Sequence, residues 1–175
     1  MMVSCGAIGP DVIDTQAFLR CLEELRRLLG SSVLALPVSF GSFCQVELVG
    51  TLSNNEKIVS EAKISSVDHK QIYTDVAYYT PDLKYTICPC AADHAIQAVN
   101  DLKEGDFIVL GPGSEFTSKM AVLNFQGIPG AIIEARQRGV LVFYVINLTA
   151  DCEIRGQSVS SLVGLYERMA GYRFE

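Results

Sequence analysis

The sequence predicts an α/β domain with a mainly parallel sheet and an inserted β-hairpin. The second half of the chain alternates helical and strand patterns, which indicates parallel strands joined by crossover helices. Two of its strand segments are unbroken apolar runs, which are typical of strands covered on both faces. Partly alternating apolar residues on either side of a polar turn predict the hairpin over residues 44–64. We expect residues 1–175 to form a single domain.

Length and composition agree with a folded domain. The chain has 175 residues, 49% of them hydrophobic and 19% charged, and can bury a sizeable core. Its net charge of −6 argues against non-specific binding to nucleic acid or anionic membranes. No apolar run reaches the ~18 residues of a membrane span, and the first residues lack a signal-peptide pattern. The six cysteines, mostly within apolar runs, indicate a reducing compartment, so we predict a cytoplasmic protein.

The first half combines one amphipathic helix with extended segments. The helix is predicted from Asp14 or Thr15 to Leu29, because apolar residues recur at helical spacing and Gly30 follows as a C-terminal cap. The hairpin turn is expected at residues 53–55, where Ser-Asn-Asn is typical turn chemistry. Extended segments are expected over residues 32–36, 44–49, 58–64 and 72–79.

The second half supplies the crossovers and the predicted site. Helices are expected over residues 90–102, 119–125, 131–138 and 158–172, and strands over 107–110 and 140–146. Ligands of such sheets lie outside the carboxyl ends of the strands. Two loops follow the two strands, over residues 111–118 and 147–156. If the strands are neighbours, both loops face one crevice.

The first of these loops has the composition of an anion site. Gly111 and Gly113 allow positive φ and leave no Cβ in the way of a ligand, and Pro112 stiffens the loop. Hydroxyls follow, in residue types that begin helices. Open backbone N–H groups at such a turn favour a phosphate. The alternative is a tight strand-to-helix turn without a ligand, since neither the P-loop nor the dinucleotide pattern is present.

Other candidate groups give weaker signals. Cys88-Pro-Cys90 could supply half of a metal site, but only His94 is at hand to extend it, so we predict no metal there. Asp151 and Glu153 could form an acidic pair, although acids in a loop are usually solvated. No nucleophile or general base is recognisable, and catalytic residues are left unassigned.

Several motifs together resemble a known family. Leu110-Gly-Pro-Gly-Ser114 is followed by Thr117-Ser118, Gly127-Ile128, Ala131-Ile132 and Asn147-Leu148. This order resembles the 2-phospho-L-lactate transferase-like superfamily, and more closely its bacterial gluconeogenesis-factor branch. The similarity spans about residues 29–156 and implies a Rossmann-like three-layer α/β fold. The family's opening Gly-Gly-Gly-Thr-Gly segment is missing, so the chain looks like the C-terminal part of a larger family protein.

The resemblance implies binding of a phosphate-bearing ligand of the nucleotide, nucleotide-sugar or phospho-lactyl type. It also implies a possible transferase activity, Mg²⁺ together with a bound nucleotide, and a homodimer. The alternative is a non-catalytic structural or oligomerisation domain without a small-molecule ligand. The residues that the resemblance places at the ligand are Gly111, Pro112, Gly113, Ser114, Thr117, Ser118, Asn147, Thr149, Glu153 and Gly156.

Overall fold

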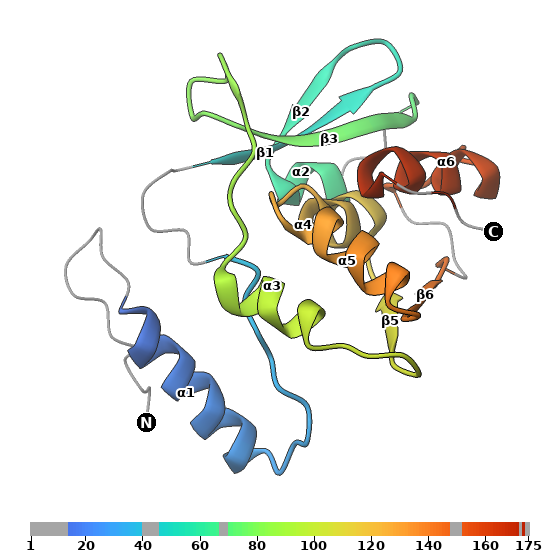
Figure 1. Cartoon of the computed structure of the whole chain (residues 1–175). Helices are drawn as coiled ribbons and strands as arrows, with labels where there is room; N and C mark the ends of the chain where they lie inside the picture. The colour runs from blue at the N-terminus through green and yellow to red at the C-terminus, as the bar shows by residue number, and fades with distance from the viewer. Residues whose placement is uncertain (1–13, 40–45, 67–69, 148–151, 172, 174–175) are drawn as a thin grey trace.

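The structure, a computed structural model, describes residues 14–39, 46–66, 70–147, 152–171 and 173 (Figure 1). These residues form two sheets and the helices around them. One sheet has four antiparallel strands in the order β2-β1-β3-β4, and the other is the parallel pair β5-β6. In Figure 1 the helices α4 and α5 lie between the two sheets. The predicted α/β class is confirmed, although the larger of the two described sheets is antiparallel.

The antiparallel sheet is built from β1 (Glu47–Leu52), β2 (Lys57–Val59), β3 (Tyr73–Tyr79) and β4 (Thr86–Ile87). β1 and β2 pair as the hairpin of the predicted fold. The prediction of a second hairpin strand to residue 64 was wrong, because the chain turns at Ser60 (φ 86°) into helix α2 (Glu61–Ser66). Its first residues, Glu-Ala-Lys, are strong helix formers.

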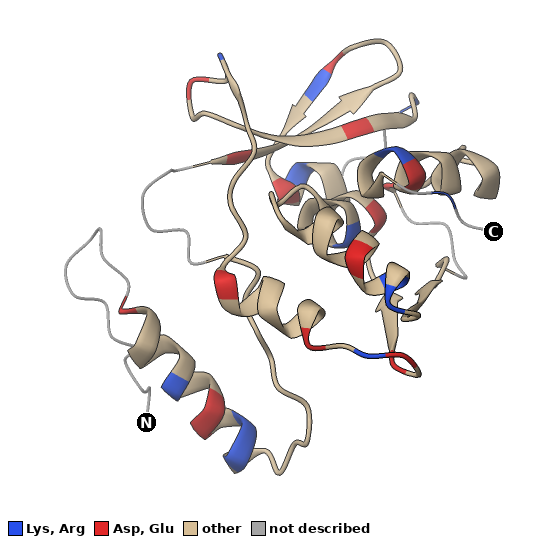
Figure 2. Cartoon of the chain, viewed as in Figure 1, with Lys and Arg blue, Asp and Glu red and all other residues tan. Residues whose placement is uncertain are grey.

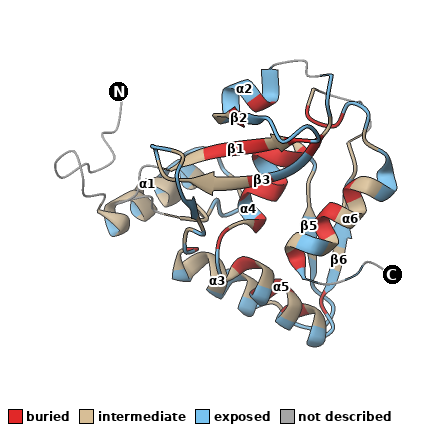
Figure 3. Ribbon diagram, turned by 90° about the horizontal axis from the view of Figure 1, so that it is seen from above, coloured by how far each residue is buried: buried red, intermediate tan, exposed pale blue. Residues whose placement is uncertain are grey.

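This sheet lies on the best-packed part of the core. The central strand β1 buries Val49 and Leu52 almost completely, as the red segments of Figure 3 show. Tyr73 of β3 packs on Phe116 with ring centroids 5.2 Å apart. The Asn124 side-chain amide donates to the Val76 carbonyl over 2.6 Å and ties β3 to the residue after α4. The antiparallel sheet is therefore anchored to the helices that follow the predicted loop.

The parallel pair consists of β5 (Phe107–Leu110) and β6 (Leu141–Tyr144), in register from Phe107↔Leu141 to Leu110↔Tyr144. The connection runs through π-helix η1 (Glu115–Met120), α4 (Ala121–Leu123) and α5 (Ile128–Gln137). The parallel pairing confirms the prediction. The expected cover on both faces was wrong for this chain, since alternate side chains of both strands are exposed.

Three more helices complete the described chain. α3 (Asp93–Asn100) and α6 (Val159–Ala170) both pack against α5. α1 (Thr15–Leu28) begins at Asp14, whose carboxylate accepts from the Ala17 N–H over 2.9 Å. α1 has no buried residue and stands apart from the core in Figure 1. Its predicted extent is confirmed, but its apolar stripe does not reach the core.

The strand predicted over residues 32–36 is absent. This segment is irregular and joins no ladder among the described residues. It leads to Pro37 and Val38, whose carbonyls contact the start of α3: His94 Nε2 lies 2.8 Å from the Pro37 oxygen, and the Ala92 N–H donates to Val38. None of the helices in the described ranges is long and apolar enough to cross a membrane.

Candidate functional site

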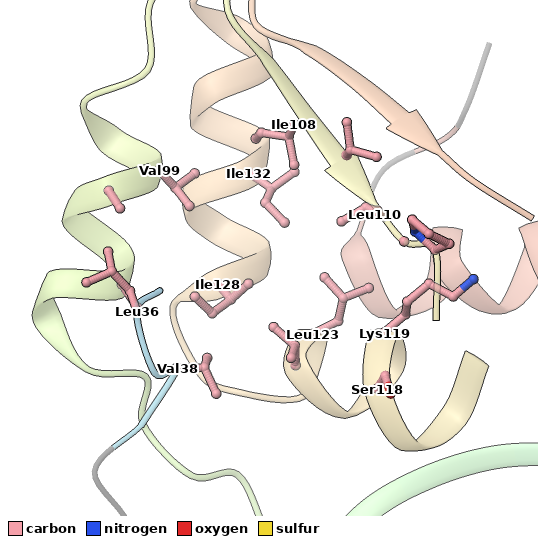
Figure 4. Close-up of a pocket in the computed structure, with 16 residues that line it drawn as sticks. Leu36, Val38, Val99, Ile108, Leu110, Ser118, Lys119, Leu123, Ile128 and Ile132 are labelled. Atoms are coloured by element: carbon pink, nitrogen blue, oxygen red, sulfur yellow. The ribbon is translucent and has the colours of Figure 1, made fainter. Parts of the chain in front are cut away.

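A pocket of about 420 Å³ opens at the carboxyl end of β5 (Figure 4). Gly111, Pro112 and Ser118 of the predicted loop line one part of it, together with Lys119. The rest of the lining is apolar and comes from α3, α4, α5, β5 and residues 36–38, which contact the start of α3. Those residues include Leu36, Val38, Val99, Ile108, Leu110, Leu123, Ile128 and Ile132.

The two loop glycines have different roles. Gly111 has φ 108°, and a Cβ there would lie 2.9 Å from the Val145 carbonyl oxygen. Gly113 has φ 150°, but a Cβ there would meet only Ser118, at 3.6 Å. Gly111 therefore permits a close approach between the ends of β5 and β6. Gly113 has a backbone conformation that other residues rarely adopt. Both positive φ values agree with the sequence-based expectation.

Part of the predicted anion site is filled by the protein itself. Glu153, only 1% exposed, accepts from the N–H groups of Phe116 and Thr117 over 2.7 and 3.1 Å. The hydroxyls of Thr117 and Ser65 donate to the other carboxylate oxygen over 2.5 and 3.1 Å. The expectation that amides of this turn are open to a ligand was therefore wrong for Phe116 and Thr117. Thr117 and Glu153 do come together, but they bond to each other.

The amides just before them are different. Within the described part of the chain, no hydrogen-bond acceptor is found for the N–H groups of Gly113, Ser114 and Glu115. Ser114 caps η1 by position only, since its side chain makes no capping hydrogen bond. Glu115 is fully buried, so the polar groups that the loop can offer to a ligand are the N–H groups of Gly113 and Ser114 and the exposed Ser118 hydroxyl. Of these three residues, only Ser118 lines the pocket.

A buried charged pair lies in η1, directly after the loop. The sequence analysis did not identify it. Glu115 is fully buried, and its Oε1 atom lies 2.5 Å from Lys119 Nζ. Its Oε2 atom accepts from the hydroxyls of Tyr144 and Tyr166 over 2.8 and 3.0 Å. Burial is the main cause that raises the pKa of both tyrosines well above the usual value, and the Glu115 carboxylate raises it further. Both hydroxyls therefore keep the proton that they donate to Glu115. The i,i+4 spacing of Glu115 and Lys119 was the available sequence signal.

Lys119 also joins the two predicted loops. Its Nζ donates to the Val145 carbonyl over 3.0 Å and lies 3.5 Å from Asn147 Oδ1. Asn147 is thereby held beside the first loop, but it does not line the pocket, and its contact with a ligand stays a prediction. Gly156 lies elsewhere and does not line the pocket. It packs so close to Ile72 that a Cβ at position 156 would be 3.0 Å from that side chain. Thr149 lies outside the described residues.

The carboxylates near the loop do not form a site that fits a magnesium ion. Both described carboxylates at this place, Glu115 and Glu153, are buried and already accept from protein donors. The described residues contain no group of three or more acidic, cysteine or histidine side chains that could hold a metal. Asp151 lies outside the described residues. Magnesium with a bound nucleotide stays a prediction.

Comparison with known proteins gives the family. Residues 10–174 match the family described as 2-phospho-L-lactate transferase CofD. Two crystal structures of the Bacillus halodurans protein BH3568, one described as a member of the UPF0052 family, are similar to this chain. In each case the TM-score is 0.67 and the identity 25%, over 88% of this chain and 44% of that one. A comparison with curated proteins found no match.

The chain thus spans less than half the length of the solved structures that it matches. The family match covers nearly all of the chain, including the loop, the charged pair beneath it and both sheets. It confirms the predicted resemblance to the superfamily, and the UPF0052 neighbours are consistent with the gluconeogenesis-factor branch. The chain belongs to the 2-phospho-L-lactate transferase CofD family.

Proposed function

We propose that this chain binds a phosphate-bearing ligand in the pocket at the carboxyl end of β5. One observation carries the proposal: Gly111, Pro112 and Ser118, named from the sequence as ligand contacts, line a single pocket together. The matched family is described as a transferase of 2-phospho-L-lactate, a phosphorylated compound. A pocket at the end of a parallel strand is the usual ligand site of such sheets.

The two parts of the pocket suit different parts of one ligand. The Ser118 hydroxyl lines the pocket, and the N–H groups of Gly113 and Ser114 belong to the same loop; these are donors without partners among the described residues, and they suit phosphate oxygens. The apolar part of the lining suits an organic moiety such as a base or a short carbon chain. A volume of about 420 Å³ lies within the ~300–1,000 Å³ of small-molecule sites. A nucleotide, a nucleotide-sugar and a phospho-lactyl compound all meet this description.

Lys119 has a positioning role in this proposal. Its ammonium group is neutralised by Glu115 and bonded to the Val145 carbonyl, so it holds the loop against the end of β6. Figure 4 shows its nitrogen on the side away from Val99 and Leu36. The phosphate is bound by backbone and hydroxyl donors, and transfer chemistry is left without assigned catalytic residues.

Thermal unfolding with ligands tests the proposal. Inorganic phosphate, UDP-glucose, NAD and GTP are added separately, with and without Mg²⁺. A ligand at about 100 times its Kd stabilises the folded chain by ~2.7 kcal/mol, or roughly 5–11 °C for a domain of this size. Ser118→Ala is expected to reduce the shift, because it removes one phosphate donor.

Ser160→Ala is the matched control, since Ser160 is also an exposed serine but lies on α6, outside the pocket lining. Its ligand shift is expected to equal that of the unchanged chain. Unchanged unfolding temperatures with all four ligands would contradict the proposal and favour the alternative, a structural domain without a small-molecule ligand. Equal losses of the shift in the two serine variants would also contradict it.

A further inference from the structure

The pocket at the carboxyl end of β5 has one polar end, and the rest of its lining is aliphatic. Among the described residues that line it, only Ser118 and Lys119 have polar atoms in their side chains. Figure 4 shows these two on one side of the pocket and Leu36 and Val99 on the opposite side. The other lining residues are alanine, valine, leucine, isoleucine, glycine and proline, without one aromatic ring. A ligand therefore meets polar side chains at one end only.

The charge at the polar end is already used within the protein. Lys119 Nζ lies 2.5 Å from Glu115 Oε1, 3.0 Å from the Val145 carbonyl oxygen and 3.5 Å from Asn147 Oδ1, which gives each of its three protons an acceptor. The Ser118 hydroxyl is the side-chain donor that is left for a ligand. The wall formed by β5 adds no charged residue, as its tan colour in Figure 2 shows.

The aliphatic part of the lining is poorly suited to a base or a sugar. Proteins bind bases by hydrogen bonds to their edges and by stacking on aromatic rings or arginine. Sugar hydroxyls that enter an apolar site without partners lose the hydrogen bonds that they make to water. The lining side chains offer neither stacking nor hydrogen bonds away from the Ser118 end. An alkyl chain needs no polar partner and gains from burial alone.

The packing of the helices forms this space before any ligand binds. Ala95 and Ala98 lie one turn apart on α3 and line the pocket, where larger side chains would fill it. On the other walls, Leu123, Ile128 and Ile132 are between 3% and 6% exposed, so the core holds them in place. A cavity of about 420 Å³ remains between them.

We infer that the ligand is a single-chain aliphatic phosphate. Its phosphate lies at Ser118, and its alkyl chain lies between α3, α5 and residues 36–38. The inference rests on the phosphate binding proposed above and narrows the organic part of that ligand to a saturated or unsaturated carbon chain. The net charge of −6 disfavours an anionic bilayer as the source, so we assign a ligand that is free in solution.

A series of chain lengths tests the inference. Butyl, hexyl and octyl phosphate are titrated into the full chain by calorimetry, at concentrations below those at which they form micelles. 1-Octanol, inorganic phosphate, UMP and GMP are the comparison ligands. Affinity is expected to rise about fourfold for each added methylene, which corresponds to ~0.8 kcal/mol, until the chain fills the pocket. Inorganic phosphate should compete with octyl phosphate, because both need the donors at Ser118.

Ala98→Asp is expected to weaken binding of octyl phosphate at least tenfold, because it puts a carboxylate beside the alkyl chain. Ala62→Asp is the matched control, since Ala62 is also an exposed alanine in a helix but lies on α2, outside the pocket lining. Val122→Asp is a second variant of the lining, at a side chain that is 42% exposed. Circular dichroism and thermal unfolding check that all three variants fold.

The possible failures can be told apart. If UMP, GMP or inorganic phosphate binds and octyl phosphate binds less than tenfold more tightly than butyl phosphate, the aliphatic ligand is wrong and phosphate binding stands. If 1-octanol binds as tightly as octyl phosphate, the phosphate site itself is wrong. Equal weakening by Ala98→Asp and Ala62→Asp would place the chain outside this pocket. Sedimentation with phosphatidic acid vesicles, but not with phosphatidylcholine vesicles, would overturn the assignment to a ligand free in solution.

Discussion

The two sheets of this chain differ in how completely they are packed. The antiparallel sheet is built from short local connections, and its central strand β1 is buried by β2, β3 and α2. The parallel pair is formed by strands about 30 residues apart, and half of its side chains remain exposed. The antiparallel sheet thus pairs strands that are close in the sequence, whereas the parallel pair joins strands that are farther apart.

The largest effect on the free energy of unfolding is expected at the buried pair of Glu115 and Lys119. Glu115→Ala removes the carboxylate that pairs with the buried Lys119 ammonium and accepts from the hydroxyls of Tyr144 and Tyr166. Breaking a buried pair in this way costs about 3–5 kcal/mol in the free energy of unfolding. Urea unfolding measures it, with Glu134→Ala on the exposed side of α5 as control. A loss below 1 kcal/mol would mean that the cluster does not support the loop.

The next effect compares the two sheets directly. Leu52→Ala in β1 removes a side chain that is 1% exposed and is expected to cost about 2–5 kcal/mol. Phe143→Ala in β6 removes a larger but half-exposed side chain and is expected to cost about 1 kcal/mol or less. Both values come from urea unfolding. If Phe143→Ala cost as much as Leu52→Ala, the exposed side of β5 and β6 would be covered in solution.

The well-packed antiparallel sheet, which contains Tyr73, is expected to lose stability at alkaline pH. Burial, and next the Glu153 charge, raise the pKa of Tyr73 to about 12, against about 10 in the unfolded chain. Below pH 10 the hydroxyl is protonated in both states. As pH rises towards 12, only the unfolded state loses the proton, so stability falls. About 1.4 kcal/mol should be lost by pH 11, out of at most about 2.7 kcal/mol.

Tyr73→Phe removes this contribution and should reduce the loss of stability between pH 9 and 11. Urea unfolding at the two pH values measures the difference, and Tyr85→Phe is the control, since Tyr85 is largely exposed. Tyr78, whose pKa burial also raises to about 12, keeps part of the alkaline loss in both variants. An unchanged pH dependence in Tyr73→Phe would show that Tyr73 is not buried as described.

The smallest effect is expected in α1. Leu25→Ala lies on a helix without buried residues and should change the free energy of unfolding by less than about 0.5 kcal/mol. A loss above 2 kcal/mol, measured by urea unfolding, would show that α1 packs on another element in solution.

Local sequence patterns predicted much of the fold. The extent of α1 followed from helical spacing and from Asp14, and β5 and β6 followed from their apolar runs. The same runs led to the wrong expectation that both faces of these strands are buried. Apolar residues indicate that a strand is suited to burial, but they do not show which segments of the protein bury it. The strand expected to residue 64 failed for a different reason, since three helix formers after Ser60 were read as part of an alternating pattern.

The candidate site was predicted in its loop but not in its support. Gly111 and Gly113 could be identified because their backbone conformation limits the residue types that fit. Glu153 was expected at the ligand, yet it binds amides 36 and 37 residues earlier in the chain. Such a pairing depends on how distant segments meet, and no local pattern records it. The hydroxyls of Tyr144 and Tyr166 at Glu115 are missed for the same reason.

The carboxylate of Glu153 has one more consequence for the loop. Since it already satisfies the first turn of η1, that turn has its final shape before any ligand arrives, and binding has less chain to immobilise. The same charge repels a second anion that comes too close to the helix axis. The proposed phosphate would therefore lie away from Glu153, and the loop would discriminate ligands by where their charge sits as well as by its sign.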